Sequence, residues 1–261
     1  MMDPDLLAVL LLLGLGGGFL SGLLGLGGAI FMIPLLLYVP PLLGVGQFSM
    51  KEVAAISMVQ VLSASLSGLI VHRKNRFVSK SLLISMGLFN IMGNLAGSIL
   101  SKYTRSALLL SIFATMAIIA AVAMFIPKRE QGKEIPPEEI LYNKPLASAM
   151  SLAIGCFGGM VGAPGAFIYI PVMIYILNIP TRIVIGSTLG IVFLGAIAGT
   201  VGKMYTGQVL WPEAISLVVG TIPGAQIGGK MSKKVETRHL RLAIAIIIAI
   251  TGLRMWYGIL F

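Results

Sequence analysis

Long apolar runs separated by short polar connections make up most of the chain. A helix needs about 20 apolar residues to cross a bilayer, and six runs have close to that length. The first and fifth runs each have 33 residues and contain glycines and a proline, which interrupt regular helix. The pattern predicts an all-α, polytopic membrane protein built from the runs 6–38, 53–71, 81–100, 107–126, 145–177, 184–202, 211–229 and 242–261.

The two halves of the chain resemble each other. The connection 127–144 contains four Lys or Arg, four Glu and three Pro, so it is a solvated linker between a first repeat, 1–126, and a second, 145–261. The segment GFLSGLLGLGGAIFMIPLLLY from Gly18 aligns with GCFGGMVGAPGAFIYIPVMIY from Gly155 in its glycines, its proline and its last tyrosine. Shared apolar composition would not align so many Gly and Pro, so we predict an internal repeat.

Composition and charge exclude several classes of protein. Only 11% of the residues are charged and 57% are hydrophobic, whereas a soluble domain has about 25% charged residues. This excludes a soluble enzyme and a disordered chain, and the single cysteine excludes a disulfide scaffold. The net charge of +10 comes from Lys and Arg that lie almost wholly between the apolar runs. We therefore expect the partner to be the lipid bilayer and not nucleic acid.

The positive residues also bear on topology, because Lys and Arg accumulate in cytoplasmic connections. If every run crosses once, they divide nine to nine between the two sides, leaving out Arg254, which lies inside the last run. If each 33-residue run returns to the side it entered from, the division is 14 to 4. The second arrangement predicts two inverted-topology repeats. Each has a Gly-rich broken or re-entrant segment followed by three spanning helices. The alternative is eight single spans, with each long run forming one tilted helix.

The glycine breaks are candidate binding sites. Irregular backbone at membrane depth is tolerated only where it is buried in protein or lines a cavity. A break at 25–28 or 162–165 exposes N–H groups at the start of the next half-helix, which attract anions. Alternatively, the glycines only permit close helix packing. The candidate residues at the breaks are Gly25, Gly27, Gly28, Ala29, Gly162, Pro164, Gly165 and Ala166.

Polar side chains complete the predicted site. All nine acidic residues lie at termini, in connections or at run ends, which disfavours a cation transporter. Neutral polar residues such as Gln60 and Asn90 are plentiful inside the runs. Facing two helix starts, such residues would make a neutral anion pocket, although singly they also serve as contacts between helices. The side chains that we assign to this pocket are Ser57, Asn94, Ser187 and Gln226.

The motif G-x-x-S-G-x-x-G-x-G-G, followed by an apolar stretch and Pro34 and repeated in the second half, resembles the TauE/SafE family of sulfite exporters. The resemblance implies movement of sulfite or organosulfonates across the bacterial inner membrane, usually outward. By resemblance, the family motif includes Gly22, Gly25, Gly27, Gly28 and Pro34, with Gly159, Gly162, Gly165 and Pro171. The second copy departs from the motif at Ala163 and Pro164, which replace Leu26 and Gly27.

We therefore expect a secondary transporter of a small sulfur-containing anion in the cell inner (plasma) membrane. An anion channel, or a transporter of another small anionic metabolite, is the alternative. An intramembrane enzyme is disfavoured, because no His, Asp or Glu cluster lies inside the runs. We expect no cofactor and no metal, since His72, His239 and Cys156 lack ligand spacing. A coupling ion and a homo-oligomer stay open.

Overall fold

The computed structural model describes residues 4–24, 27–72, 78–125, 140–231 and 255–256, and these are helical with no strand. Six of the described helices are long and apolar enough to cross a membrane, which confirms the prediction of a helical, multi-pass membrane protein. α7 continues directly into a short π-helix, η1. The helices are α1 (Pro4–Leu24), α2 (Ala29–Leu42), α3 (Met50–His72), α4 (Lys80–Leu100), α5 (Ser106–Phe125), α6 (Lys144–Val161), α7 (Ala166–Pro171), η1 (Val172–Ile176), α8 (Thr181–Tyr205) and α9 (Trp211–Met231).

Local signals in the sequence begin and end several of these helices. Ser49 and Glu52 form a capping box at the start of α3, where the Ser49 N–H donates to Glu52 Oε2 at 2.7 Å. Asn143 Oδ1 accepts the N–H of Leu146 at the start of α6. α6 ends at Gly162, whose φ of 79° is a left-handed conformation that glycine adopts without steric cost.

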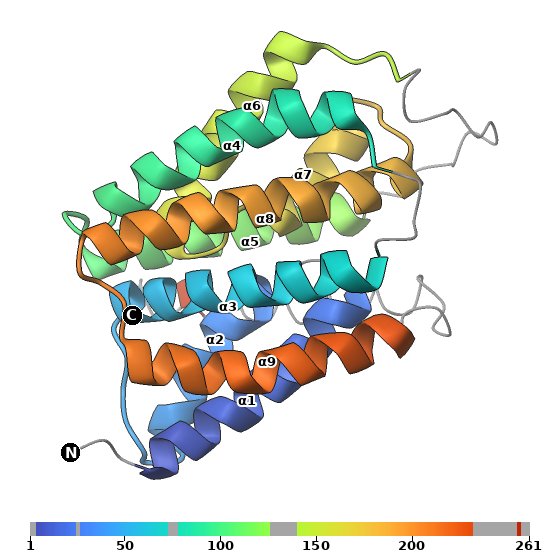
Figure 1. The fold of residues 1–261 in the computed structure, drawn as a ribbon. Helices are drawn as coiled ribbons and strands as arrows, with labels where there is room; N and C mark the ends of the chain where they lie inside the picture. Colours follow the sequence, from blue (N-terminus) through green and yellow to red (C-terminus); the bar gives the residue numbers. More distant parts are fainter. Residues whose placement is uncertain (1–3, 25–26, 73–77, 126–139, 232–254, 257–261) are drawn as a thin grey trace.

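Two helix pairs form the closest contacts of the bundle, and each pair joins the two halves of the chain. α1 of the first half packs along α9 of the second, and α4 packs along α6 (Figure 1). Glycines let the backbones touch: a Cβ added to Gly18 would lie 2.4 Å from the carbonyl oxygen of Thr221, and one added to Gly97 would clash with the carbonyl of Cys156. Gly22 and Gly159, at matching positions of the repeat, also press against backbone, that of Ala225 and Asn94. Gly22 and Gly159 therefore serve to let two helices pack closely, which is the alternative role considered for these glycines.

The contacts at the helix ends show the direction in which each half enters the bundle. Leu6 near the start of α1 packs beside Gly46, which connects α2 to α3, so the first broken segment begins and ends at one end of the bundle (Figure 1). The second broken segment begins and ends at the opposite end, where Tyr142 contacts Ser81 and the Ser79 N–H donates to Ser187. These are the directions expected for an inverted repeat, which stays a prediction.

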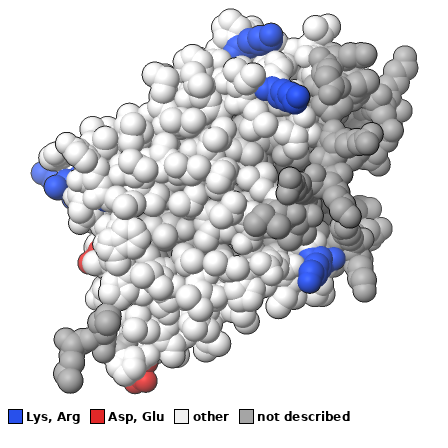
Figure 2. Space-filling model, in the orientation of Figure 1, with Lys and Arg blue, Asp and Glu red and all other residues white. Residues whose placement is uncertain are grey.

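The surface matches a protein that crosses a bilayer. Figure 2 shows Lys, Arg, Asp and Glu at the two ends of the visible face and an uncharged band between them. Large apolar side chains are exposed along the helices, among them Leu12, Ile84, Leu88, Ile119, Val122 and Ile215. Because lipid tails are themselves apolar, such side chains are stable on the outside of a membrane protein.

The predicted inverted topology has a consequence for sidedness. We expect the connections 72–80, 127–144 and 230–241 to be cytoplasmic, with Lys51 and Lys203 at the outer side; most residues of these connections lie outside the described part of the chain. Lys102→Cys and Lys230→Cys place exposed thiols at opposite ends of the bundle. In a Cys156→Ala background, an impermeant maleimide added to intact cells should label position 102 and leave position 230 unlabelled. Labelling of both positions from outside would contradict the arrangement.

Candidate functional site

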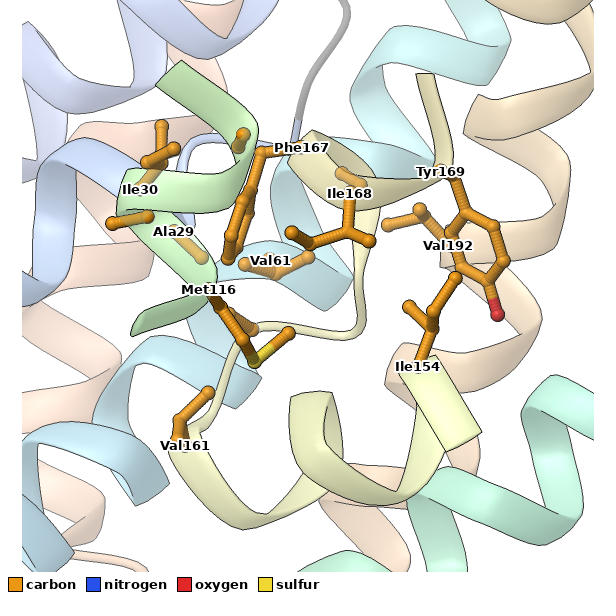
Figure 3. Packing of buried hydrophobic residues seen from close by; sticks show 14 of the residues in the cluster. Ala29, Ile30, Val61, Met116, Ile154, Val161, Phe167, Ile168, Tyr169 and Val192 are labelled. Atoms are coloured by element: carbon orange, nitrogen blue, oxygen red, sulfur yellow. The ribbon is translucent and has the colours of Figure 1, made fainter. Parts of the chain in front are cut away.

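The two broken segments meet in the middle of the bundle. A Cβ added to Gly27, in the first break, would lie 3.1 Å from Val61 of α3, 3.4 Å from Val192 of α8 and 4.0 Å from Ala166, the first residue of α7. Figure 3 shows Ala29 and Ile30 of α2 close to Phe167 and Ile168 of α7. The starts of α2 and α7 are thus brought together from the two halves of the chain.

Both half-helices begin with unpaired backbone donors. α2 starts after Gly28 and α7 after Gly165, at φ values of 78° and 92°, and neither helix has a side-chain cap. In α2 the first helical hydrogen bonds are those of Phe31 and Met32 to the Gly28 carbonyl, so the N–H groups of Ala29 and Ile30 have no helical acceptor. The pattern repeats at Ile168 and Tyr169 in α7. The positive ends of two helix dipoles therefore face the centre of the bundle.

Two fully buried polar side chains of α3 lack hydrogen-bond partners, and one of them lies at the start of α2. Gln60 on α3 is fully buried, and neither its Nε2 nor its Oε1 has a hydrogen-bond partner. A Cβ added to Gly28 would lie 3.2 Å from both Gln60 Nε2 and Ser21 Oγ, so these two side chains flank the cap. Ser57, one helical turn before Gln60, is also fully buried with an unpartnered hydroxyl. Sequence reasoning placed Ser57 in the site and left Gln60 out, although their spacing of three residues puts both on one helix face.

The polar side chains around α7 are mostly paired with one another. The Tyr169 hydroxyl donates to Asn90 Oδ1 at 2.8 Å and lies 2.7 Å from Ser151 Oγ. Asn94 Nδ2 donates to the same Asn90 oxygen at 2.6 Å, and Asn90 Nδ2 donates to the carbonyl of Ile191. Asn94, a predicted site residue, therefore belongs to a network between α4, α6, α7 and α8, in which only its Oδ1 lacks a partner.

The remaining predicted site residues are not all gathered at the centre. Ser187 Oγ accepts the N–H of Ser79 at 3.1 Å, near the start of α8. Gln226 is exposed on the surface of α9. The residue of α9 that packs against Gly22 is its neighbour, Ala225. Gly162 and Pro164 are buried in the second break, where Gly162 presses against the backbone of Ala54. Gly25 lies outside the described residues.

Lys203 is a buried charge that the sequence analysis assigned to a connection. The predicted apolar run ends at residue 202, before Lys203, but α8 continues to Tyr205 and the Lys203 side chain is fully buried. Its Nζ donates to Ser101 Oγ at 2.5 Å, to Gln208 Oε1 at 3.2 Å and to the Met160 carbonyl at 3.5 Å. Arg254, the charge predicted inside a span, lies outside the described residues. Lys203 thus joins the C-terminal ends of α4 and α6 to α8, where a cation complements both helix dipoles.

Replacing Lys203 with Met should lower the thermal stability of the protein. The substitution keeps the side-chain length but removes the three hydrogen bonds that Nζ donates. Gln208 Oε1 keeps the bond from Ser101 Oγ, and an acceptor that is left without any donor costs about 1–3 kcal/mol. We expect a lower midpoint of thermal unfolding in detergent, measured by the fluorescence of a thiol-reactive dye. Lys102→Met, at an exposed position at the same end of the bundle, is the control and should leave the midpoint unchanged. Equal midpoints for the two variants would show that the contacts of Lys203 do not stabilise the bundle.

The fold and its centre define a class: a polytopic membrane protein in which two broken helices from the two halves of the chain place their N-terminal ends together inside the bundle. The chain belongs to the family described as sulfite exporter TauE/SafE, which matches residues 10–255. No solved structure matches the chain.

Relatives over nearly the full length carry names that agree with this class. YunE of Bacillus subtilis, a "probable membrane transporter protein", is 24% identical and covers 95% of this chain and 97% of its own. A probable membrane transporter protein of Xylella fastidiosa is 27% identical over 95% of each chain. YdhB of Bacillus subtilis, named in the same way, is 28% identical over 92% of this chain and 96% of its own.

Proposed function

We propose that this protein is a secondary transporter that exports a small sulfur-containing anion, such as sulfite or an organosulfonate, across the inner membrane. The observation that carries the proposal is the meeting of the α2 and α7 starts, because helix N-termini in a water-poor interior are binding sites for anions. The family supports a sulfur oxyanion as the cargo. The activity proposed is transport, and it needs no catalytic group.

The electrostatics of the described core agree with anionic cargo. None of the described residues that are buried is Asp or Glu, whereas neutral donors such as Ser57, Gln60, Asn94 and Ser187 are buried there. Two helix ends each contribute up to about 2 kcal/mol to anion binding in favourable, partly buried geometries. Removing the anion from water is costly, so we expect only a modest net affinity.

The repeat supports alternating access. Inverted repeats let a transporter open to either side by rocking one bundle of helices against another around a site near the midplane. We propose that α1 with α9 and α4 with α6, the two glycine-packed pairs that link the halves, move as rigid units around the meeting point of α2 and α7. The inverted topology itself is part of this proposal.

Flux measurements in proteoliposomes test the function. Purified protein should carry radiolabelled sulfite into vesicles loaded with unlabelled sulfite, with a rate that saturates and with exchange between the two sides. Taurine and thiosulfate, each tested in place of sulfite, define the specificity. A flux that rises linearly with concentration and shows no exchange would indicate an anion channel, which would use the same backbone donors. An absence of flux for every sulfur anion would refute sulfur-anion transport.

A further inference from the structure

We propose that the two half-sites are not equivalent: the anion binds at the start of α2, in the first half, and Gln60 is the side chain that holds it and selects an oxyanion. This inference rests on the proposed function and names the site within it. The candidate ligands of the anion are the free N–H groups of Ala29 and Ile30, the amide of Gln60 and the hydroxyl of Ser57.

The first argument is the condition of Gln60. Its amide is fully buried and both of its polar atoms lack a partner, although buried amides are nearly always hydrogen-bonded. Its Nε2 lies beside the Gly28 cap, at the positive end of a helix of 14 residues. A buried amide left open beside unpaired backbone N–H groups is arranged to bind an additional acceptor, and an oxyanion is the acceptor that these donors and the dipole favour.

The second argument is the loss of these features in the other half. Aligning Gly18 with Gly155 pairs Ser21 with Gly158, and aligning Ser57 with Ser187 pairs Gln60 with Gly190. Neither glycine has a side chain to donate a hydrogen bond. The counterpart of Ser57 is Ser187, whose hydroxyl already accepts the Ser79 N–H. At these positions the first half therefore keeps Gln60 and Ser57 unpaired, whereas the second half has a glycine and a paired serine.

The third argument is steric. At the start of α7, a Cβ added to Gly165 would clash with Ile154 and lie 2.9 Å from the ring of Tyr169, so apolar groups crowd this helix start. Figure 3 shows Ile154 and Tyr169 side by side at this point. The Tyr169 hydroxyl is directed to Asn90 and Ser151 instead of toward a ligand. An anion that lies between the two helices thus finds side-chain donors beside the α2 start, whereas the side chains beside the α7 start form an apolar wall.

A stability measurement separates a binding role of Gln60 from a structural one. Gln60→Met replaces the unpartnered amide with an apolar side chain of similar length. If the amide is kept for a ligand, the ligand-free variant should unfold at the same or a higher temperature than wild type, because an unpaired buried polar group is lost. A structural hydrogen bond at Gln60 would instead make the variant less stable.

Binding is measured on the same proteins in detergent by isothermal titration with sulfite, with chloride as the competing anion. We expect Gln60→Met to weaken sulfite binding at least ~10-fold, about 1.4 kcal/mol, and Gln60→Glu to abolish it, since a carboxylate repels the anion. Tyr169→Phe, which removes the hydroxyl of a residue in α7, should leave sulfite affinity within about twofold of wild type.

The outcomes separate this inference from the proposed function. If wild type binds sulfite and Gln60→Met binds it equally well, the site is not at Gln60, whereas the transport function stands. If Tyr169→Phe weakens binding as much as Gln60→Met, the two half-sites contribute alike and the asymmetry is wrong. If wild type binds neither sulfite nor a sulfonate, the proposed function and the inference both fail.

Discussion

Gly18→Leu should prevent the protein from folding in the membrane, and it has the largest expected effect of the substitutions considered. A Cβ at this position would lie 2.4 Å from the Thr221 carbonyl oxygen and 2.8 Å from its Cα. Both are backbone atoms of α9, so the clash is relieved only if the two helices separate. We expect a cost above the ~1–3 kcal/mol typical of overpacking, because contact along the whole α1–α9 pair is lost.

The control lies two residues away on the same helix. A Cβ added to Gly16 meets nothing within 4 Å, so Gly16→Leu adds the same apolar side chain at an exposed position. Detergent extracts of the two variants, compared by fluorescence-detected size exclusion, should show a monodisperse peak for Gly16→Leu and aggregate for Gly18→Leu. Two identical monodisperse profiles would mean that the glycine contacts between α1 and α9 are not required.

Gly28→Leu and Gly165→Leu should each abolish transport in protein that still reaches the membrane. Both glycines cap a half-helix at positive φ, and at Gly28 the new side chain would enter the space between Ser21 and Gln60. A leucine at Gly28 covers the free N–H groups that the anion must approach, and a leucine at Gly165 would collide with Ile154 and the ring of Tyr169 and displace the apolar side chains at the start of α7. We expect the rate of sulfite uptake into proteoliposomes to fall to the level of empty vesicles.

The backbone strain of these substitutions needs its own control, because a leucine at positive φ is strained wherever it lies. Gly44 and Gly207 have φ values of 69° and 68° with nothing within 4 Å of an added Cβ. Gly44→Leu and Gly207→Leu therefore reproduce the strain without filling the centre, and both should retain transport. If Gly28→Leu and Gly165→Leu fold and transport like wild type, the glycine breaks have no part in the mechanism.

The breaks in the two long runs could be predicted because their signal is local. Glycine at positive φ and proline in the first turn of a helix end one helix and start another with little help from tertiary contacts. The structure places the caps at Gly28 and Gly165, within the predicted segments. The same reasoning misplaced the end of the sixth run, because a lysine inside a membrane helix is stable only if groups from other helices accept hydrogen bonds from its ammonium group. Two of those groups, Ser101 after α4 and the Met160 carbonyl in α6, come from other parts of the fold.

The direction of polar side chains was less predictable. A step of one residue turns a helix by 100°, so Gln226 faces outward while Ala225 packs inward, and nothing in the local sequence distinguishes these two positions. Asn94 was predicted to be an anion ligand, yet Asn90 lies one turn away and Tyr169 arrives from another helix to form a network with it. Gln60 was not assigned to the site, because the feature that marks it, a buried amide without a hydrogen-bond partner, is visible only in the structure.

The sequence by itself determined that the chain is a helical membrane protein with an internal repeat and two broken segments, because apolar length, glycine, proline and repetition act along the chain. Only the tertiary structure decided which helices of one half pack against helices of the other. It also decided that the starts of α2 and α7 meet, and which polar groups are left unpaired there. Those features depend on packing between residues far apart in sequence. In a bilayer such packing is set by the shapes of the helices and by the hydrogen bonds between them. Lipid tails are as apolar as the side chains, so burying an apolar side chain against another helix is hardly more favourable than leaving it in lipid.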